Sequence, residues 1–413
     1  MTKRRVVVTG FGIVSPHGLD VEKAWQSVIS GNSAVCSIDR FDTTQVRSKV
    51  AASLKDYRSE LYFDAKEIKR MDRFIEYGLI AADNAYQNAD LDRDSLDLER
   101  AGVCIGSGIG GLQTIEETSI HSHTKLHRIS PFFIPSSIIN MVSGMASMRL
   151  GFLGPNFSVA TACATGSHCI GLSARSIAYG DADIMIAGGT ESPITPISIG
   201  GFSSLRALTT KNDEPEKASR PFDRDRDGFV IAEGSAVLVL ESLEHAKARG
   251  ADIKAEIVGF GMSSDAHHIT MPDPSGRGAH LAMTSAMKDA NISSPDDVDY
   301  INAHGTSTPK GDEIEPMVVK KIFGERPRVA MSSTKSMHGH LLGAAGSLES
   351  VWCCLAIRDQ VIPPTINLDQ PDTICDHINM VPHTYQEQKV KTVINNSFGF
   401  GGTNVSLIFK AYD

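Results

Sequence analysis

A short motif occurs twice in this 413-residue chain, and the repetition constrains the fold more than any other feature. Val8–Gly12 reads Val-Thr-Gly-Phe-Gly and Ile257–Gly261 reads Ile-Val-Gly-Phe-Gly, so Gly10 aligns with Gly259 at an offset of 249 residues. Two further resemblances keep the same order while their offsets drift. They pair the segment ending at Cys163 with the one ending at Lys335, and Ala187–Thr190 with Phe400–Thr403. We therefore predict two copies of one unit that differ by insertions.

Each copy reads as apolar, β-prone runs that alternate with helical segments. This alternation predicts an α/β architecture with mostly parallel sheets covered by helices. The length, with 41% hydrophobic and 22% charged residues, suits two ordinary globular domains. We place these domains at 1–252 and 253–413 and expect them to pack around one site.

Cys163 lies where an apolar run, Phe157–Ala160, gives way to small residues that suit a close-packed helix. This predicts a strand-to-helix turn with the sulfur at the helix N-terminus. The helix dipole and the unpaired N–H groups there favour the thiolate, which is a good acyl acceptor. A lone cysteine in such a run is more often a small buried hydrophobe, so the catalytic interpretation needs further support.

Two distant histidine segments provide that support. His304 follows the apolar run Tyr300–Ala303, and His340 lies within Ser332–Gly346, and each segment reads as a strand followed by a polar turn. Reacting groups collect at strand ends in α/β sheets. Either histidine alone would fit a hydrogen-bonded core residue, but a thiol and two histidines at strand ends predict a catalytic centre.

Together these segments resemble the Cys-His-His active site of the β-ketoacyl-acyl-carrier-protein synthases, the elongating condensing enzymes of fatty acid synthesis. The resemblance runs from Val6 to Phe409 and includes Arg220–Asp223, Arg226–Val230 and Asn396–Asn404. One departure is Ala-Glu-Gly-Ser at 232–235, where the family usually has Gly-Glu-Gly-Ala. The resemblance implies a thiolase-like fold, in which two duplicated α/β halves form a five-layered α-β-α-β-α sandwich.

The resemblance also implies a decarboxylative Claisen condensation, in which Cys163 carries a fatty acyl group and malonyl on the carrier protein supplies the enolate. The enolate oxygen needs fixed N–H donors, which two neutral imidazoles supply. His304 and His340 would fill that role, and the charge of Lys335 would set the local field. The other implied roles are an oxyanion hole from the N–H groups of Cys163 and Phe400, gating by Phe398, Gly399 and Phe400, and support by Glu349, Asp312, Thr306 and Thr308.

The acyl pocket should be apolar, and the resemblance places four residues along it: Ile109, Phe133, Ile134 and Phe202. A bulky side chain at 109 would restrict medium-length acyl chains until it swings away, which favours a type II synthase over type I. The carrier protein is acidic, so a net-negative enzyme needs a local basic patch. The candidates, which would otherwise read as a solvated face, are Lys66, Lys69, Arg70, Arg128 and Arg206.

The resemblance assigns the nucleophile and the cap and dimer insertions to the first half, and both histidines to the second. The apolar, proline-containing insertion Ser130–Met141 is hard to bury in one subunit and predicts a homodimer with isologous contacts. Substrates would arrive on the phosphopantetheine of acyl carrier protein, and no cofactor would be required. No metal is required either, although a monovalent cation near Asn302, Glu349 and Asn395 would fit the resemblance.

Composition excludes several other classes. The net charge of −9 argues against nucleic-acid binding, and no apolar run approaches a membrane span. The N-terminus lacks the apolar core of a secretory signal, and seven scattered cysteines read as reduced thiols, so we expect a cytoplasmic protein. Gly106–Gly111 matches a dinucleotide-binding pattern, but without a convincing acidic partner downstream. Asp223–Gly228 begins like a calcium loop and lacks the closing glutamate.

Three other functions stay open at this point. A cysteine hydrolase would use one histidine oriented by Asn or Asp, which leaves the second histidine unexplained. A thiolase-type acyltransferase normally has a second cysteine where this chain has Asn396–Gly402. A non-catalytic chain-length-factor subunit would lack the nucleophile.

Overall fold

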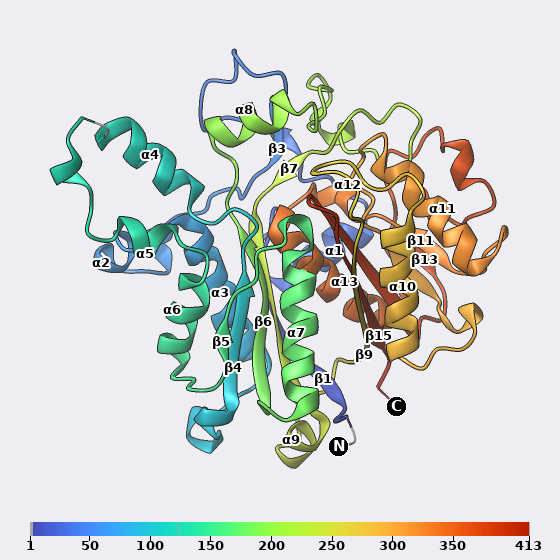
Figure 1. The fold of residues 1–413 in the computed structure, drawn as a ribbon, viewed down its shortest axis with the longest axis horizontal. Coiled ribbons are helices and arrows are strands. Elements are labelled where there is room, and N and C mark those ends of the chain that lie inside the picture. Colours follow the sequence, from blue (N-terminus) through green and yellow to red (C-terminus); the bar gives the residue numbers. More distant parts are fainter. Residues whose placement is uncertain (1–2, 123, 413) are drawn as a thin grey trace.

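The computed structural model describes residues 3–122 and 124–412, and within them ten strands form one continuous sheet with a clear internal symmetry (Figure 1). From its outer edge inward, the first half contributes β5 (Asn156–Phe157), β4 (Ala101–Gly106), β6 (Ile184–Glu191), β8 (Gly234–Ser242) and β1 (Val6–Val14). The second half contributes, in the same spatial sequence, β11 (Ala330–Ser332), β10 (Tyr300–Asn302), β14 (Thr392–Gly399), β15 (Thr403–Lys410) and β9 (Ala255–Ser264). Both halves therefore use one strand arrangement.

The two half-sheets join only where β1 and β9 begin. Val6, Val7 and Val8 pair antiparallel with Ile257, Glu256 and Ala255, and the strands then diverge. In each half the two outer pairs of strands are parallel, and the two inner pairs are antiparallel. The predicted parallel sheets are therefore mixed sheets.

Two long helices, α7 (Thr165–Tyr179) and α13 (Ala345–Asp359), lie between the half-sheets (Figure 1). Thirteen of the fifteen residues of α13 are buried, as expected for a helix that is surrounded on all sides. Outside them, α3 (Arg73–Asn88) packs on β1, β6 and β8, and α10 (Arg277–Asp289) packs on β9 and β15. The order of layers is α-β-α-β-α, as predicted.

The repeated glycines explain why the outer helices lie so close to the sheet. A Cβ on Gly10 would lie 2.6 Å from the carbonyl oxygen of Ala85 in α3, and a Cβ on Gly259 would overlap the carbonyl oxygen of Ala286 in α10. The alignment of Gly10 with Gly259 is therefore confirmed, because both glycines make the same helix-to-strand contact.

The other two alignments of the repeat are wrong in register. Cys163 lies in the 3-10 turn η5 (Ala162–Ala164) before α7, and the matching turn before α13 is η8 (Leu342–Ala344). Ala162 and Leu342 even share a left-handed φ, 49° and 47°. The counterpart of Cys163 is thus Gly343, not Lys335. Similarly, Gly188 lies inside β6, whereas Gly401 lies in the turn between β14 and β15. Small residues occur in both strands and turns, which misled the alignment.

The remaining elements cap this framework. The helices are α1 (Val21–Ile29), α2 (Ala65–Ile68), α4 (Leu112–Ser122), α5 (Phe133–Ser137), α6 (Met141–Leu150), α8 (Pro196–Ser204), α9 (Leu243–Ala248), α11 (Gly311–Phe323) and α12 (Lys335–His338). The short strands are β2 (Cys36–Ser37), β3 (Val50–Ala52), β7 (Ile231–Ala232), β12 (Val361–Ile362) and β13 (Gln386–Glu387). None of the helices in the described ranges is long and apolar enough to cross a membrane. The domain boundary at residue 252 remains a prediction.

Substitution of Gly12 tests the close contact of β1 with α3. A Cβ there would overlap the backbone carbonyl of Ala81, which cannot rotate away. We expect Gly12→Ala to lower the free energy of unfolding in urea by about 1–3 kcal/mol. The control is Gly201→Ala in α8, where a Cβ meets no atom and should be neutral or stabilising. Equal stability of the two variants would contradict the packing argument.

Candidate active site

Cys163 lies in the tight turn η5, which follows the short strand β5 and leads into the central helix α7. Its neighbour Ala162 has φ 49°, a left-handed conformation that non-glycine residues seldom adopt. Two backbone N–H groups, those of Cys163 itself and of Phe400, lie close enough to the sulfur to lower the pKa of the thiol. Phe400 reaches this position because a Cβ on its neighbour Gly399 would lie only 2.8 Å from the carbonyl oxygen of Thr161. The structure thus brings together the two N–H groups that the sequence predicted.

The two predicted histidines face each other in the same cavity. His304 follows β10 and His340 follows α12, and their ring centroids lie 5.5 Å apart with the ring planes at 84°. Burial, followed by the charge of Lys335, holds the pKa of both imidazoles well below the usual range. Both rings are therefore neutral. Nδ1 of His304 and both ring nitrogens of His340 are buried with no hydrogen-bond partner among the described residues.

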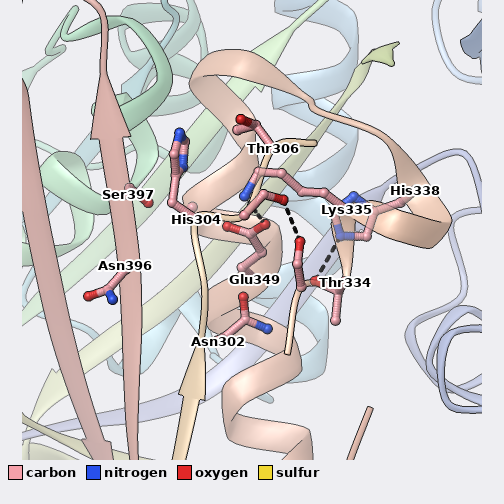
Figure 2. Close-up of polar contacts among 12 residues, drawn as sticks. Asn302, His304, Thr306, Thr334, Lys335, His338, Glu349, Asn396 and Ser397 are labelled. Carbon is pink, nitrogen blue, oxygen red and sulfur yellow. Dashed lines mark hydrogen bonds and ion pairs between the residues drawn. The ribbon is translucent and has the colours of Figure 1, made fainter. Parts of the chain in front are cut away.

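Lys335 forms a fully buried ion pair with Glu349, as predicted. Figure 2 shows Lys335 extending from α12 towards Glu349 on α13, beneath His304. Burial raises the pKa of Glu349 to about 7, and the neighbouring lysine opposes this rise. The ammonium group of Lys335 thus lies close enough to both histidines to lower their pKa, while Glu349 balances its charge and neither group is exposed to water.

Burial controls the cysteine as well. It raises the pKa of the Cys163 thiol to about 12, against the opposing effects of Lys335 and of the N–H groups of Phe400 and Cys163. The N–H groups at the helix N-terminus lower the thiol pKa, as the sequence predicted, but burial outweighs them in the substrate-free site. A thiol at this position loses its proton only when it reacts.

A cavity of about 450 Å³ connects these groups. The reactive part of its lining contains Cys163, His304, His340, Phe398, Gly399 and Phe400. Ile109 and Phe202 form an apolar wall, where the ring of Phe202 lies 6.5 Å from that of Phe400. Thr306, Thr308 and Arg206 also line the cavity, and the Thr306 and Thr308 hydroxyls are 2.9 Å apart.

Comparison with known families agrees with this arrangement. The model of the β-ketoacyl synthase N-terminal domain matches residues 3–246, and that of the C-terminal domain matches residues 254–369. The chain belongs to the β-ketoacyl synthase family. The family resemblance and the thiolase-like fold predicted from the sequence are confirmed.

Individual members of the family are similar over the full length. The Coxiella burnetii protein named 3-oxoacyl-[acyl-carrier-protein] synthase 2 is 53% identical over 412 residues, which cover 99% of each chain. A Vibrio harveyi protein of the same name is 51% identical, again over 99% of each chain. A type II polyketide ketosynthase solved with its acyl-carrier protein has a TM-score of 0.92 and 34% identity, with both chains covered completely. A β-ketoacyl synthase from Burkholderia phymatum has the same TM-score and identity, over 99% of this chain and 100% of the other.

Two predicted pocket residues of this β-ketoacyl synthase lie elsewhere. Phe133 and Ile134 belong to α5, outside the residues that line the cavity, and Ile134 is 59% exposed. A single chain therefore does not place them at the acyl pocket, because α4 and α5 project beyond the central sheet, whereas α6 packs against β4 and β5 (Figure 1). Ile109 and Phe202 are where the sequence predicted them.

Buried acids hold the catalytic segments of the synthase, and the sequence analysis identified only some of them. Glu315 on α11 accepts hydrogen bonds from the backbone N–H groups of His304 and Gly305, each at 2.9 Å. Asp312, which was predicted, accepts from the N–H groups of Thr306 and Ser307 at the same distance. Glu315 was missed, although an acid three residues after Asp312 on one helix face was a usable signal. Glu191 was missed too.

The predicted docking residues are all exposed. Lys66, Lys69 and Arg70 lie in and just after α2, Arg128 ends the turn η4 (Leu126–Arg128), and Arg206 stands at the cavity. None of the five forms an ion pair with another described residue. Their charges are therefore available to a partner.

Three buried oxygens lie where the resemblance suggested a cation. Asn302 Oδ1, Asn395 Oδ1 and Glu349 Oε2 have no hydrogen-bond partner in the described parts of the chain. Asn302 and Asn395 pair across β10 and β14, and Figure 2 shows Asn302 beside Glu349. No group of three His, Cys, Asp or Glu side chains in the described residues suits a transition metal.

The reactivity of Cys163 towards iodoacetamide tests the effect of burial. Because the thiolate reacts and burial raises the thiol pKa to about 12, the alkylation rate of the substrate-free protein should rise through about pH 10 without a plateau near 8.5. Mass mapping separates Cys163 from the half-buried Cys36, and Cys163→Ser is the control. A plateau below about pH 8 would show that Lys335 and the helix N-terminus outweigh burial.

Proposed function

We propose that this chain is a 3-oxoacyl-acyl-carrier-protein synthase that extends fatty acyl thioesters by two carbons in type II fatty acid biosynthesis. One observation carries the proposal: a single apolar-walled cavity joins a cysteine thiol to two neutral histidines, and three of their four ring nitrogens are buried without a hydrogen-bond partner among the described residues. The two relatives of about 50% identity carry this activity in their names.

In the first half-reaction, the sulfur of Cys163 attacks the carbonyl carbon of an acyl-carrier thioester. The negative oxygen that forms is stabilised by the N–H groups of Cys163 and Phe400, which lie beside the sulfur. The bond between the acyl carbon and the carrier sulfur then breaks. The proton of the Cys163 thiol ends on the phosphopantetheine thiol of the carrier.

In the second half-reaction, malonyl on the carrier loses CO2, and its thioester oxygen becomes an enolate oxygen. His304 and His340 each donate one N–H to that oxygen, because a neutral imidazole has one donor. The enolate carbon attacks the acyl carbon, the bond to Cys163 breaks, and the sulfur takes a proton from solvent, since the malonyl carboxylate leaves as CO2 without one. The charge of Lys335 disfavours protonation of either histidine and so preserves this donor arrangement.

The nature of the cavity supports a type II rather than a type I synthase. Half-buried Ile109 stands in the wall of the acyl cavity beside Cys163, where a bulky side chain limits chain length until it moves. The reaction needs no cofactor, since the substrates bring their own activated thioesters. The seven free cysteines agree with a cytoplasmic enzyme.

The partner in both half-reactions is acyl carrier protein. The exposed cations Lys66, Lys69, Arg70, Arg128 and Arg206 offer it a basic surface on a protein of net charge −9. None of them pairs with an acid among the described residues, and Arg70 lies over the ring of Phe132. The polyketide ketosynthase that resembles this chain was solved with its own acyl-carrier protein.

A homodimer would cover the apolar surface of the first half. The exposed residues there are Ile115, Leu126, Ile134, Ile138 and Met148 on or near α4, α5 and α6. The neighbouring strand β5 is an edge of the ten-stranded sheet, and an edge strand presents unpaired backbone groups. An isologous partner placed here would also bring its own Phe133 and Ile134 towards this chain.

A monovalent cation would fit the three orphaned oxygens of Asn302, Asn395 and Glu349. Oxygen donors suit a hard cation. Its role would be structural, since it would give these three oxygens the partner that they lack among the described residues.

The other candidate activities have less support. Cys375 is the cysteine nearest the C-terminus, but it is buried in a different hydrophobic cluster from Cys163, so a thiolase-type second cysteine is missing. A hydrolase would leave His340 without a role.

An elongation assay tests the proposed function. With acyl-carrier thioesters of graded length and malonyl-carrier, mass spectrometry should find CO2 and a 3-oxoacyl product that is two carbons longer. Cys163→Ala should abolish the product. His304→Ala or His340→Ala should slow decarboxylation by about 10²–10³-fold while Cys163 still becomes acylated. Free acid as the product would indicate a hydrolase, and no turnover would indicate a non-catalytic subunit.

Charge reversal tests the docking surface. Lys69→Glu with Arg70→Glu should lower kcat/KM for acyl-carrier substrates by about tenfold or more at low salt. Acylation by a small acyl-pantetheine thioester should not change. The matched control reverses Lys288 and Lys391, which are also exposed. Unchanged carrier-dependent rates would remove this surface from the proposal.

Mass photometry tests the dimer. Leu126→Asp with Ile134→Asp places two charges on the apolar surface and should shift the protein from dimer to monomer. Leu281→Asp on α10 alters an exposed leucine of the other half and should leave the dimer intact. A wild-type monomer at micromolar concentration would overturn the proposal.

A further inference from the structure

Glu191 is a buried carboxylate that the mechanism above does not use. It ends β6, has 0% exposure, and forms no ion pair with a described residue. Instead it accepts four hydrogen bonds. Its Oε1 accepts from Ser107 Oγ at 2.7 Å and from the Ile109 N–H at 3.1 Å, and its Oε2 accepts from the N–H groups of Gly108 at 2.8 Å and Gly343 at 2.9 Å. Each carboxylate oxygen thus accepts two hydrogen bonds, one for each lone pair.

These donors belong to two segments that meet at the acyl cavity. Ser107, Gly108 and Ile109 lead into the apolar wall, and Gly343 lies in the turn that follows His340. The contact leaves no spare room, because a Cβ on Gly108 would lie 2.8 Å from Glu191 Oε2 and one on Gly343 would lie 2.7 Å from it. Glu191 therefore fixes the distance between the acyl-pocket wall and the histidine segment.

We propose that Glu191 is a positioning residue for acyl-chain selection, which holds the backbone of Ile109 against the turn after His340. The inference rests on the proposed function and goes beyond it, because it assigns the resting position of the wall to one carboxylate. If the Ile109 backbone is fixed, its side chain can move aside only by a change of rotamer. Long acyl chains then enter the cavity more slowly than short ones. If the Ile109 backbone loses its hydrogen bond to Glu191, the backbone and the side chain can both move away from a long acyl chain.

The chemistry of glutamine makes Glu191→Gln a selective test. One side-chain oxygen becomes an NH2 group, which cannot accept a hydrogen bond from a backbone N–H. With the NH2 at the Oε1 position, the Ser107 hydroxyl can reverse and accept, and the bonds from Gly108 and Gly343 remain. Among the backbone groups, only the Ile109 N–H then loses its acceptor. The opposite orientation loses two backbone bonds, so the variant should settle in the first one.

The measurement is single-turnover acylation of Cys163 by carrier thioesters of graded length, followed by intact mass. For Glu191→Gln, the ratio of short-chain to long-chain acylation rates should move about five- to tenfold towards one. In an Ile109→Ala background, Glu191→Gln should change the ratio of acylation rates little further, because both substitutions act on the side chain of residue 109. Ser107→Ala, which removes one of the four bonds to Glu191 together with the acceptor of the Gly110 N–H, should shift the ratio in the same direction and serves if Glu191→Gln does not fold.

The matched control is Glu241→Gln. Glu241 is also fully buried, and it pairs with Ile184 at the far end of β6, away from the cavity. An equal loss of rate at all chain lengths in Glu191→Gln, or the same ratio change in Glu241→Gln, would overturn the proposal. The proposal would also be overturned if Glu191→Gln changed the ratio of acylation rates as much in the Ile109→Ala background as in the wild-type protein. Failure of the wild-type protein to accept any acyl group from a carrier would instead refute the proposed function.

Discussion

The close contact between the two central helices is the constraint on which the rest of the structure depends. A Cβ on Gly166 of α7 would lie 2.9 Å from Ser347 Oγ of α13 and 3.0 Å from the carbonyl oxygen of Gly343. Only small residues allow the N-terminal ends of α7 and α13 to approach so closely. The turns before the two helices therefore touch, and Cys163 on one turn comes to lie beside the His340 segment that leads into the other.

The charge states of the catalytic side chains follow from their burial. Burial keeps both histidines neutral and raises the pKa of the thiol, so the resting site holds hydrogen-bond donors rather than separated charges. The exception is Lys335, which is neutralised by Glu349 below the histidines. A buried pair of this kind contributes little net stability, but removal of one partner would leave an uncompensated charge. The arrangement serves reactions whose charge develops only in the transition state.

The sequence predicted the parts of the fold and site that depend on local pattern. The glycine motif at Gly10 and Gly259 located the repeat, and the strand-turn segments located Cys163, His304 and His340. It failed where the answer depends on the surroundings of a residue. The thiol pKa depends on burial by distant segments, and Gly343 matched Cys163 only once α7 and α13 could be superimposed as elements. Phe133 and Ile134 lie on an extension whose contacts a single chain does not determine, and Glu191 is one acid at the end of an apolar strand.

The correspondence of Cys163 with Gly343 has a consequence for how such a protein can evolve. A duplicated unit starts with two equivalent turns, and each could carry a nucleophile. Here the second turn has lost that freedom, because a Cβ at Gly343 would lie 2.5 Å from the backbone nitrogen of Gly108 as well as against Glu191. Packing at Gly343 thus explains why only the first half carries a cysteine at this turn. A nucleophile at position 343 would therefore require the Gly108 segment and Glu191 to move as well.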